Sequence, residues 1–237
     1  MFVFKMRKAF IIFVLILTIL TGTLCFTAIN RTSSQANVRK YKIVLDAGHG
    51  GIDGGVVGQT TGIKESELNL SIVKKLEDYC LNAGFSVVLT RKTQAGLYGL
   101  ATSNLKRKDM QARKDIILKE RPDLVVSVHL NKFSLSSRRG AQVFYREDSE
   151  QGKILAKSIQ NSFNSMEEAP RQSSPLAGDY YLLNCSEYPS VIAECGFLSN
   201  SEDEALLVTE DYQSKIAYAI FKGIVEYLSQ NLKGHSH

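Results

Sequence analysis

Apolar residues along the chain follow two patterns, which predict two kinds of secondary structure. Short runs that are almost continuously apolar are typical of strands; they occur at Tyr41–Asp46, Phe85–Thr90, Leu124–Leu130, Gly140–Tyr145, Tyr180–Leu183 and Val191–Cys195. Longer segments place apolar residues three or four positions apart, which predicts amphipathic helices over Ser66–Asn82, Asp109–Glu120, Glu150–Phe163 and Tyr212–Leu232.

The order of these segments predicts the fold class. Strands alternate with helices along the chain, as in α/β domains in which helices cover a largely parallel sheet. Leu124–Leu130 has the apolar character of a strand that is buried on both faces of such a sheet. We therefore expect one layered α/β domain with a mostly parallel central sheet flanked by helices.

The first 30 residues differ from the rest of the chain. Residues 9–29 carry no charge and are mainly apolar, and Lys5, Arg7 and Lys8 precede them. This pattern predicts a signal peptide or an uncleaved membrane anchor, of which we favour the anchor, with the remaining chain exported. A polar linker over 31–40, a catalytic domain over 41–232 and a disordered tail over 233–237 complete the expected organisation.

Charge and cysteine content exclude some classes of function. The net charge is +5, but Lys5, Arg7 and Lys8 belong to the leader, and the remaining surface is close to balanced. Nucleic acid is therefore not an expected partner. The cysteines outside the leader have no CxxC spacing, so neither a thiolate zinc site nor a disulfide framework is indicated.

Three potential metal ligands follow or precede the predicted elements. His49 comes directly after the first strand, His129 lies near the end of Leu124–Leu130, and Glu65 directly precedes a helix. The carboxyl ends of parallel strands meet at one edge of a sheet, and two imidazoles with one carboxylate suit a catalytic zinc ion. Taken singly, a His at the end of a strand is more often a hydrogen-bonded structural residue, and a Glu at the start of a helix is usually a favourable charge there; only together do the three indicate a metal site.

Glu194 is the candidate for acid–base chemistry. It lies at the end of an apolar run and is followed by Cys195 and Gly196. A carboxylate in a buried strand costs free energy unless it is paired or used. Next to a metal it could take a proton from water and pass it to a leaving nitrogen. As an alternative, Glu194 would be a fourth ligand in a closed structural site.

The four motifs resemble, in order and in position, those of the amidase type 3 family of N-acetylmuramoyl-L-alanine amidases. They lie at 46–51, 62–65, 127–131 and 189–200, and the resemblance spans about Lys42 to Leu228. Segments 105–113 and 139–145 extend the likeness to the amidases of the spore cortex. The resemblance implies one Zn²⁺ bound by His49, Glu65 and His129, with Glu194 catalytic.

The resemblance also implies a substrate and a setting. The substrate would be peptidoglycan, cut at the amide between the lactyl group of N-acetylmuramic acid and L-alanine of the stem peptide. A spore-cortex enzyme of this kind removes peptides so that a separate deacetylase can complete muramic-δ-lactam. Asn131, Arg91 and Arg113 are candidates for binding substrate, against the simpler interpretation of a turn-capping Asn and structural arginines.

The same residues also suit other functions. A zinc peptidase or deacetylase would use the same metal chemistry on another amide, and a membrane-anchored scaffold would use none. No wall-binding repeat is recognisable in the sequence, so we expect the N-terminal segment or a protein activator to provide targeting.

Overall fold

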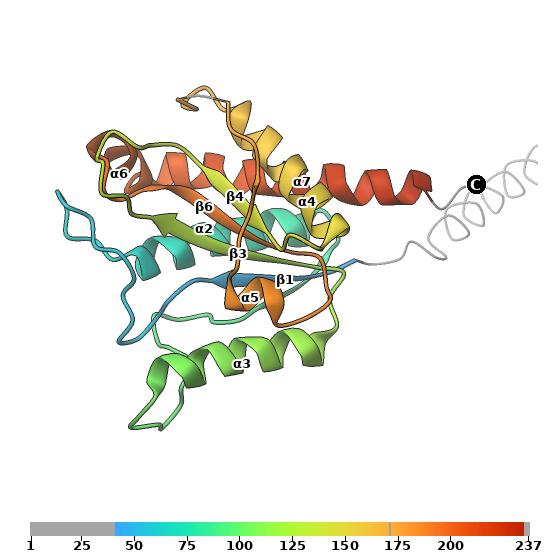
Figure 1. Ribbon diagram of the computed structural model, residues 1–237, viewed down its shortest axis with the longest axis horizontal. Helices are drawn as coiled ribbons and strands as arrows, with labels where there is room; N and C mark the ends of the chain where they lie inside the picture. The colour runs from blue at the N-terminus through green and yellow to red at the C-terminus, as the bar shows by residue number, and fades with distance from the viewer. Residues whose placement is uncertain (1–40, 171, 235–237) are drawn as a thin grey trace, which may run out of the picture. The chain divides into compact units, whose positions relative to one another are not determined.

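A computed structural model describes residues 41–170 and 172–234 of this chain (Figure 1). The expected export segment over 1–30, the linker over 31–40 and the last three residues of the expected tail lie outside the described residues. Within the described part of the chain, no helix has both the length and the apolar content needed to cross a membrane.

The described chain forms a six-stranded sheet in the order β2-β1-β3-β6-β4-β5. Four strands are mutually parallel: β1 (Lys42–Ala47), β2 (Ser86–Leu89), β3 (Leu124–Asn131) and β6 (Ser190–Phe197). The two strands β4 (Gln142–Tyr145) and β5 (Leu176–Ala177) are parallel to each other, and β4 is antiparallel to β6. The sheet is therefore mostly parallel, as expected, and it is mixed because the two strands at one edge run in the opposite direction.

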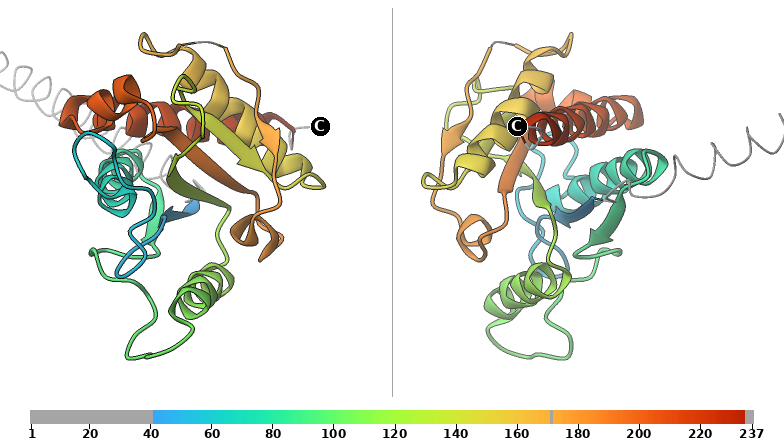
Figure 2. Two further views of the ribbon diagram at one scale, coloured as in Figure 1. Left: turned by 60° about the vertical axis from the view of Figure 1, so that its left-hand side comes forward. Right: turned by 90° about the vertical axis from the view of Figure 1, so that its right-hand side faces the viewer.

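Helices cover both faces of this sheet (Figures 1 and 2). One face carries α2 (Glu65–Asn82), α4 (Glu150–Asn164) and α7 (Glu210–Gly234), and the opposite face carries α3 (Leu105–Glu120) and the short α5 (Tyr181–Asn184). Another short helix, α6 (Ser201–Leu207), follows β6. This arrangement confirms a single α/β domain with helices on both sides of its sheet.

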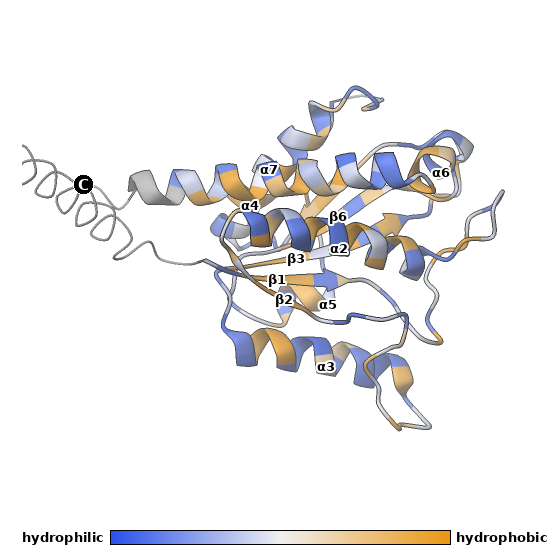
Figure 3. Ribbon diagram, turned by 180° about the vertical axis from the view of Figure 1, so that it is seen from behind, coloured by the Kyte–Doolittle hydropathy of each residue, from blue (hydrophilic) through white to orange (hydrophobic). Residues whose placement is uncertain are grey.

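The two faces differ in how much apolar surface they bury. The larger hydrophobic cluster includes Leu76, Ile159 and Ile220 from the helices α2, α4 and α7. The cluster beneath α3 and α5 has only four fully buried members, Val44, Ile117, Val125 and Leu182. Figure 3 shows the apolar colour concentrated on the strands between these layers. The thinner α3/α5 layer leaves space for a pocket.

Several predicted boundaries are wrong for physical reasons. Tyr180–Leu183 was expected to be a strand, but α5 is helical from Tyr181, because a four-residue apolar run carries too little periodicity to separate the two. Helix α3 begins at Leu105 rather than Asp109. Its first turn was not predicted because the charged residues Lys106, Arg107 and Lys108 interrupt the apolar spacing. Helix α7 reaches Gly234, two residues into the expected tail.

The hydrophobic pattern of the sequence did not predict two short elements, β5 and α6. Strand β5 has only two residues, both of them exposed. Helix α6 begins after Asn200, whose side chain accepts hydrogen bonds from the backbone N–H groups of Glu202 and Asp203 at 3.1 and 2.9 Å. This Asn cap followed by acidic residues is a recognisable start signal for a helix.

Candidate metal centre

The loop after β1 brings His49 beside His129 at the carboxyl end of the parallel strands. The Gly48 N–H donates to Val128 O at 3.0 Å, which ties this loop to β3. A Cβ atom at Gly48 would lie 2.3 Å from the His129 ring, so only glycine permits this approach. His49 itself has a φ of 61°, an uncommon conformation for a residue with a side chain.

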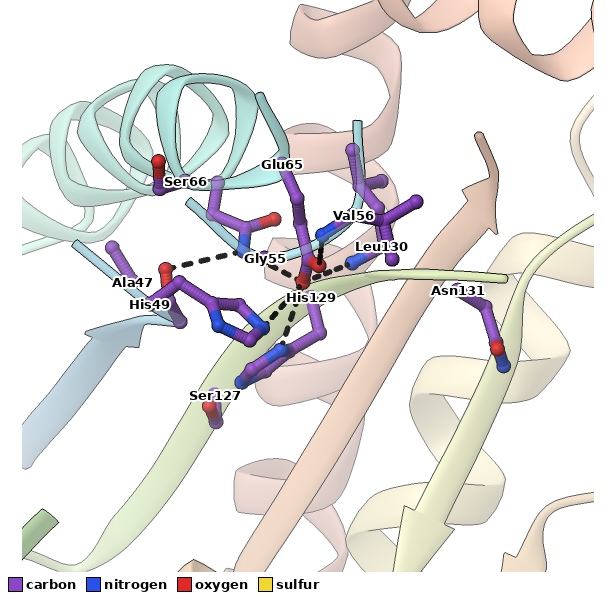
Figure 4. Close-up of polar contacts among 12 residues, drawn as sticks. Ala47, His49, Gly55, Val56, Glu65, Ser66, Ser127, His129, Leu130 and Asn131 are labelled. Carbon is purple, nitrogen blue, oxygen red and sulfur yellow. Dashed lines mark hydrogen bonds and ion pairs between the residues drawn. The ribbon is translucent and has the colours of Figure 1, made fainter. Parts of the chain in front are cut away.

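Glu65, the first residue of α2, lies between the two imidazoles (Figure 4). Its Oε1 atom is 3.2 Å from His49 Nε2 and 3.0 Å from His129 Nδ1. One ligand atom from each of the three residues lies within 4.8 Å of the others. Tetrahedral zinc with bonds of 2.0–2.2 Å places its ligand atoms about 3.3 Å apart. The donor set and its spacing therefore fit zinc.

Hydrogen bonds fix the Glu65 carboxylate in this position. Oε1 also accepts from the Leu130 N–H and from Asn69 Nδ2, each at 3.1 Å, and Oε2 accepts from the Val56 N–H at 2.9 Å. Burial opposes ionisation of Glu65, but the contacts with His129 and His49 outweigh it and hold its pKa well below the usual value. Glu65 is thus a carboxylate available to a cation.

Glu194 lies on the neighbouring strand. In the pairing of β3 with β6 it is the register partner of His129. It is 8% exposed, and no hydrogen-bond partner for its Oε2 atom lies among the described residues. Burial raises the pKa of Glu194 to about 7, a value at which it can both accept and release a proton near neutral pH.

A pocket opens beside these residues under α3 and α5. His49, His129 and Glu194 line one side, and Met110, Tyr180, Leu182 and Ile192 supply much of the remaining wall. The paired ends of β3 and β6 and the loop after β1 therefore present two possible metal ligands, His129 and His49, and the carboxyl group of Glu194 to one partly apolar space, as expected of an active site.

The three expected substrate-binding residues lie in different surroundings. Asn131 ends β3 apart from the cluster of His49, Glu65 and His129 (Figure 4), and its Oδ1 accepts from the Lys132 N–H at 2.7 Å. Its contact with substrate stays a prediction. Arg91 and Arg113 are buried, with 2% and 1% of their surface exposed, and their guanidinium groups bond to backbone carbonyls and to carboxylates.

Sequence reasoning missed the residues that support the ligands. Asp53 places Oδ1 2.9 Å from His49 Nδ1, and Asn69 bonds to Glu65. Each lies four residues after the ligand that it contacts, and on a helix such as α2 this spacing puts both side chains on one face. Asp46, which ends the apolar run of β1, accepts hydrogen bonds from Ser127 and Thr90.

Comparison with known proteins agrees with this geometry. Residues 43–226 match the family described as N-acetylmuramoyl-L-alanine amidase. The germination-specific N-acetylmuramoyl-L-alanine amidase of Bacillus subtilis (strain 168) is 33% identical over 192 residues, which cover 79% of this chain and 80% of the relative.

Solved structures are also similar. The CwlD amidase from Clostridioides difficile, in complex with the GerS lipoprotein, has 39% identity and a TM-score of 0.77 over 80% of this chain and 99% of that one. The catalytic domain of CwlV, an amidase from Bacillus (Paenibacillus) polymyxa var. colistinus, has 28% identity and a TM-score of 0.69 over 80% and 98%. The chain therefore belongs to the N-acetylmuramoyl-L-alanine amidase family, whose members hydrolyse an amide bond of peptidoglycan.

Proposed function

We propose that this protein is a zinc-dependent hydrolase that cuts the amide between the lactyl group of N-acetylmuramic acid and L-alanine. The observation that carries the proposal is the approach of Glu65 to both imidazoles, with Glu194 on the adjacent strand. His49, Glu65 and His129 would hold one Zn²⁺. When bound, zinc would polarise the scissile carbonyl and activate water.

Glu194 would carry the proton in this reaction. Its carboxylate form takes a proton from the attacking water, and the resulting acid gives that proton to the leaving nitrogen of L-alanine. A carboxyl group whose pKa is about 7 suits both steps near neutral pH. A fourth-ligand role for Glu194 would instead close the metal site and leave the reaction without this acid–base group.

Digestion of purified peptidoglycan tests the bond that is cut. We expect mass spectrometry to find free peptides that begin with L-alanine, together with muramic acid that carries no peptide. A peptidase would instead leave L-alanine attached to the lactyl group, and a deacetylase would release acetate. Zinc-free protein that acts at the full rate would contradict the metal requirement, and a protein with neither zinc nor activity would favour a scaffold.

The biological setting that we propose is the spore cortex. The support is the likeness to an amidase named germination-specific and to the CwlD amidase. Spores that lack this protein should then lose muramic-δ-lactam from their muropeptide profile, and the wild-type chain should restore it. An unchanged profile would place the enzyme in other wall turnover.

Export and a protein partner complete the proposal. The apolar segment over 9–29 would carry the domain out of the cytoplasm and attach it to the membrane or be cleaved. The CwlD amidase was solved together with a lipoprotein, which supports an activating or targeting partner here too. Full-rate, specific cleavage by residues 41–237 alone would remove the need for one.

A further inference from the structure

Two buried arginines contact the backbone that carries the proposed zinc ligands. We propose that Arg91 and Arg113 are positioning residues, which hold the His49 loop and the first turn of α2 in the arrangement that binds zinc. The inference rests on the proposed zinc site. It assigns these arginines to the metal site rather than to the substrate.

The first support is a set of three successive carbonyl groups. Ala47 O accepts from Arg91 Nε at 2.9 Å and from Arg113 Nη1 at 2.8 Å. Gly48 O accepts from Arg91 Nη2 at 2.9 Å, and His49 O accepts from Arg113 Nη2 at 2.6 Å. The carbonyls of the last residue of β1 and of the first two loop residues, Gly48 and His49, are therefore bound by guanidinium donors, which fix the path of the backbone into the loop.

The second support is a link between two ligands. The Nη2 atom of Arg91 that binds Gly48 O also donates to Ser66 O at 2.7 Å, and Ser66 directly follows Glu65. One guanidinium nitrogen thus joins the backbone beside His49 to the backbone beside Glu65. Asn69 makes a parallel connection, because its Nδ2 donates to Gly48 O at 3.3 Å and to Glu65 Oε1.

The third support is the burial and pairing of the arginines themselves. Arg113 Nε donates to Asp109 Oδ2 at 2.6 Å, and its Nη1 pairs with the fully buried Asp46. Burial and then the charge of Arg113 lower the pKa of Arg91 to about 10, so that Arg91 remains charged at neutral pH. A planar guanidinium offers several donors in a fixed geometry, whereas an ammonium group offers a single mobile point of charge.

The conformation of His49 explains why such support is required. Its φ of 61° lies in the left-handed region, which residues with a Cβ adopt only when their surroundings impose it. The bond from Arg113 to His49 O acts on the carbonyl of this same residue. Loosening that contact would let the imidazole leave the position that faces Glu65.

Zinc affinity separates a positioning role from substrate binding. The variants Arg91→Lys and Arg113→Lys keep the charge but lose the fork of donors. Competition with a chromogenic chelator should show zinc affinity weakened by about 10- to 100-fold, the usual effect of losing an outer-shell contact. The KM for glycan at saturating zinc should stay within about twofold. Arg113 lines the pocket, but it is 1% exposed and its nitrogens already donate to carboxylates and backbone carbonyls of the protein.

Arg139→Lys is the matched control, because Arg139 pairs with Glu202 and Asp203 on other elements. It should keep wild-type zinc affinity. Ile220→Ala in α7 measures the effect of lower stability alone. If Arg113→Lys does not fold, Arg91→Lys carries the test, since the guanidinium of Arg91 donates to four backbone carbonyls and its replacement breaks no buried ion pair between described residues.

Three results would overturn the inference. The first is that both arginine variants keep wild-type zinc affinity but have a raised KM. The second and third are that Arg139→Lys, or Ile220→Ala, loses as much zinc affinity as the arginine variants do. A wild-type chain that binds no zinc would instead contradict the proposed function as well, so the two failures are distinguishable.

Discussion

Glu194 and His129 are register partners on the neighbouring parallel strands β6 and β3. Partners in a parallel pair present their side chains to the same face of the sheet, and both residues line the same pocket. The strand pairing itself therefore sets the separation between a possible metal ligand and the proton-carrying group. A mobile loop is not required to bring them together.

Replacement of Glu194 by Gln should separate metal binding from chemistry. The amide keeps the shape of the side chain but cannot accept the proton, so peptide release should fall by about 100- to 10,000-fold. Zinc content, measured on purified protein, should stay at the wild-type level because the proposed ligands are intact. Loss of zinc together with activity would indicate that Glu194 is a ligand.

Glu120→Gln is the control for this substitution. Glu120 ends α3 and pairs with Lys42 at the start of β1, at the opposite edge of the sheet from the ligands. Its variant should keep both zinc and peptide release. Normal turnover by Glu194→Gln would contradict the proposed mechanism.

Much of the site could be predicted from the sequence because its chemistry lies in short motifs. His49, Glu65 and His129 each stand at the boundary of an element with a clear hydrophobic pattern, and parallel strands bring such boundaries together. The structure groups these three residues as expected. The ends of elements without a strong pattern, such as α5, could not be placed in the same way.

The roles of Arg91 and Arg113 could not be read from the sequence. Arg113 bonds to His49 O across 64 residues of chain, and a contact of this kind depends on how α3 packs against the sheet. An arginine in a polar helix has the same neighbours in the sequence whether its side chain faces solvent or the interior. Only the tertiary structure shows that this one is buried.

Zinc should stabilise the folded domain measurably. A ligand that binds only the native state adds about 2.7 kcal/mol at a concentration 100-fold above its dissociation constant. Thermal unfolding of chelator-treated wild-type protein should therefore shift to a higher midpoint when zinc is added. The variant His129→Ala should show almost no shift.

The C-terminal histidines provide the control for this measurement. The sequence ends in Gly-His-Ser-His, and a pair of histidines can bind zinc weakly wherever it occurs. Replacing His235 and His237 by Ala should leave the zinc-dependent shift unchanged. A shift that survives in His129→Ala but disappears in the tail variant would assign the binding to the tail.

Gly48 should be intolerant of even a methyl group. A Cβ at this position would lie 2.3 Å from the His129 ring, so Gly48→Ala must displace either the loop or the imidazole. We expect weaker zinc binding and lower stability, measured by chelator competition and by urea unfolding. Gly54→Ala is the matched control in the same loop, because the atoms nearest to its Cβ would belong to the flexible Lys64 side chain, the closest of them at 3.1 Å. Equal effects of the two substitutions would contradict the argument from close approach.

Asp46 should make the stability of the domain depend on pH in the acid range. Its carboxylate is fully buried, and although burial opposes ionisation, Arg113, Ser127 and Thr90 hold its pKa below the reference value of 3.8. A group whose pKa is lower in the folded state stabilises the fold above the unfolded pKa. That contribution is lost as the pH falls through the folded-state value.

The variant Asp46→Asn tests this dependence. At pH 7 it should lower the free energy of unfolding by about 3 kcal/mol, because Arg113 loses one of its two buried carboxylate partners. As the pH falls below 3.8 and then through the lower folded-state pKa, the wild type progressively loses the same contribution, so the difference in free energy of unfolding between the two proteins should narrow. Urea unfolding at pH 7, 5, 3.5 and 2.5 measures this difference in free energy of unfolding.

Glu168→Gln is the control, because it removes a surface ion pair with Lys215. It should show little difference from wild type at any of these pH values. A difference for Asp46→Asn that stays constant down to pH 2.5 would show that the loss comes from the amide group facing the donors of Arg113, Ser127 and Thr90, and not from the missing charge.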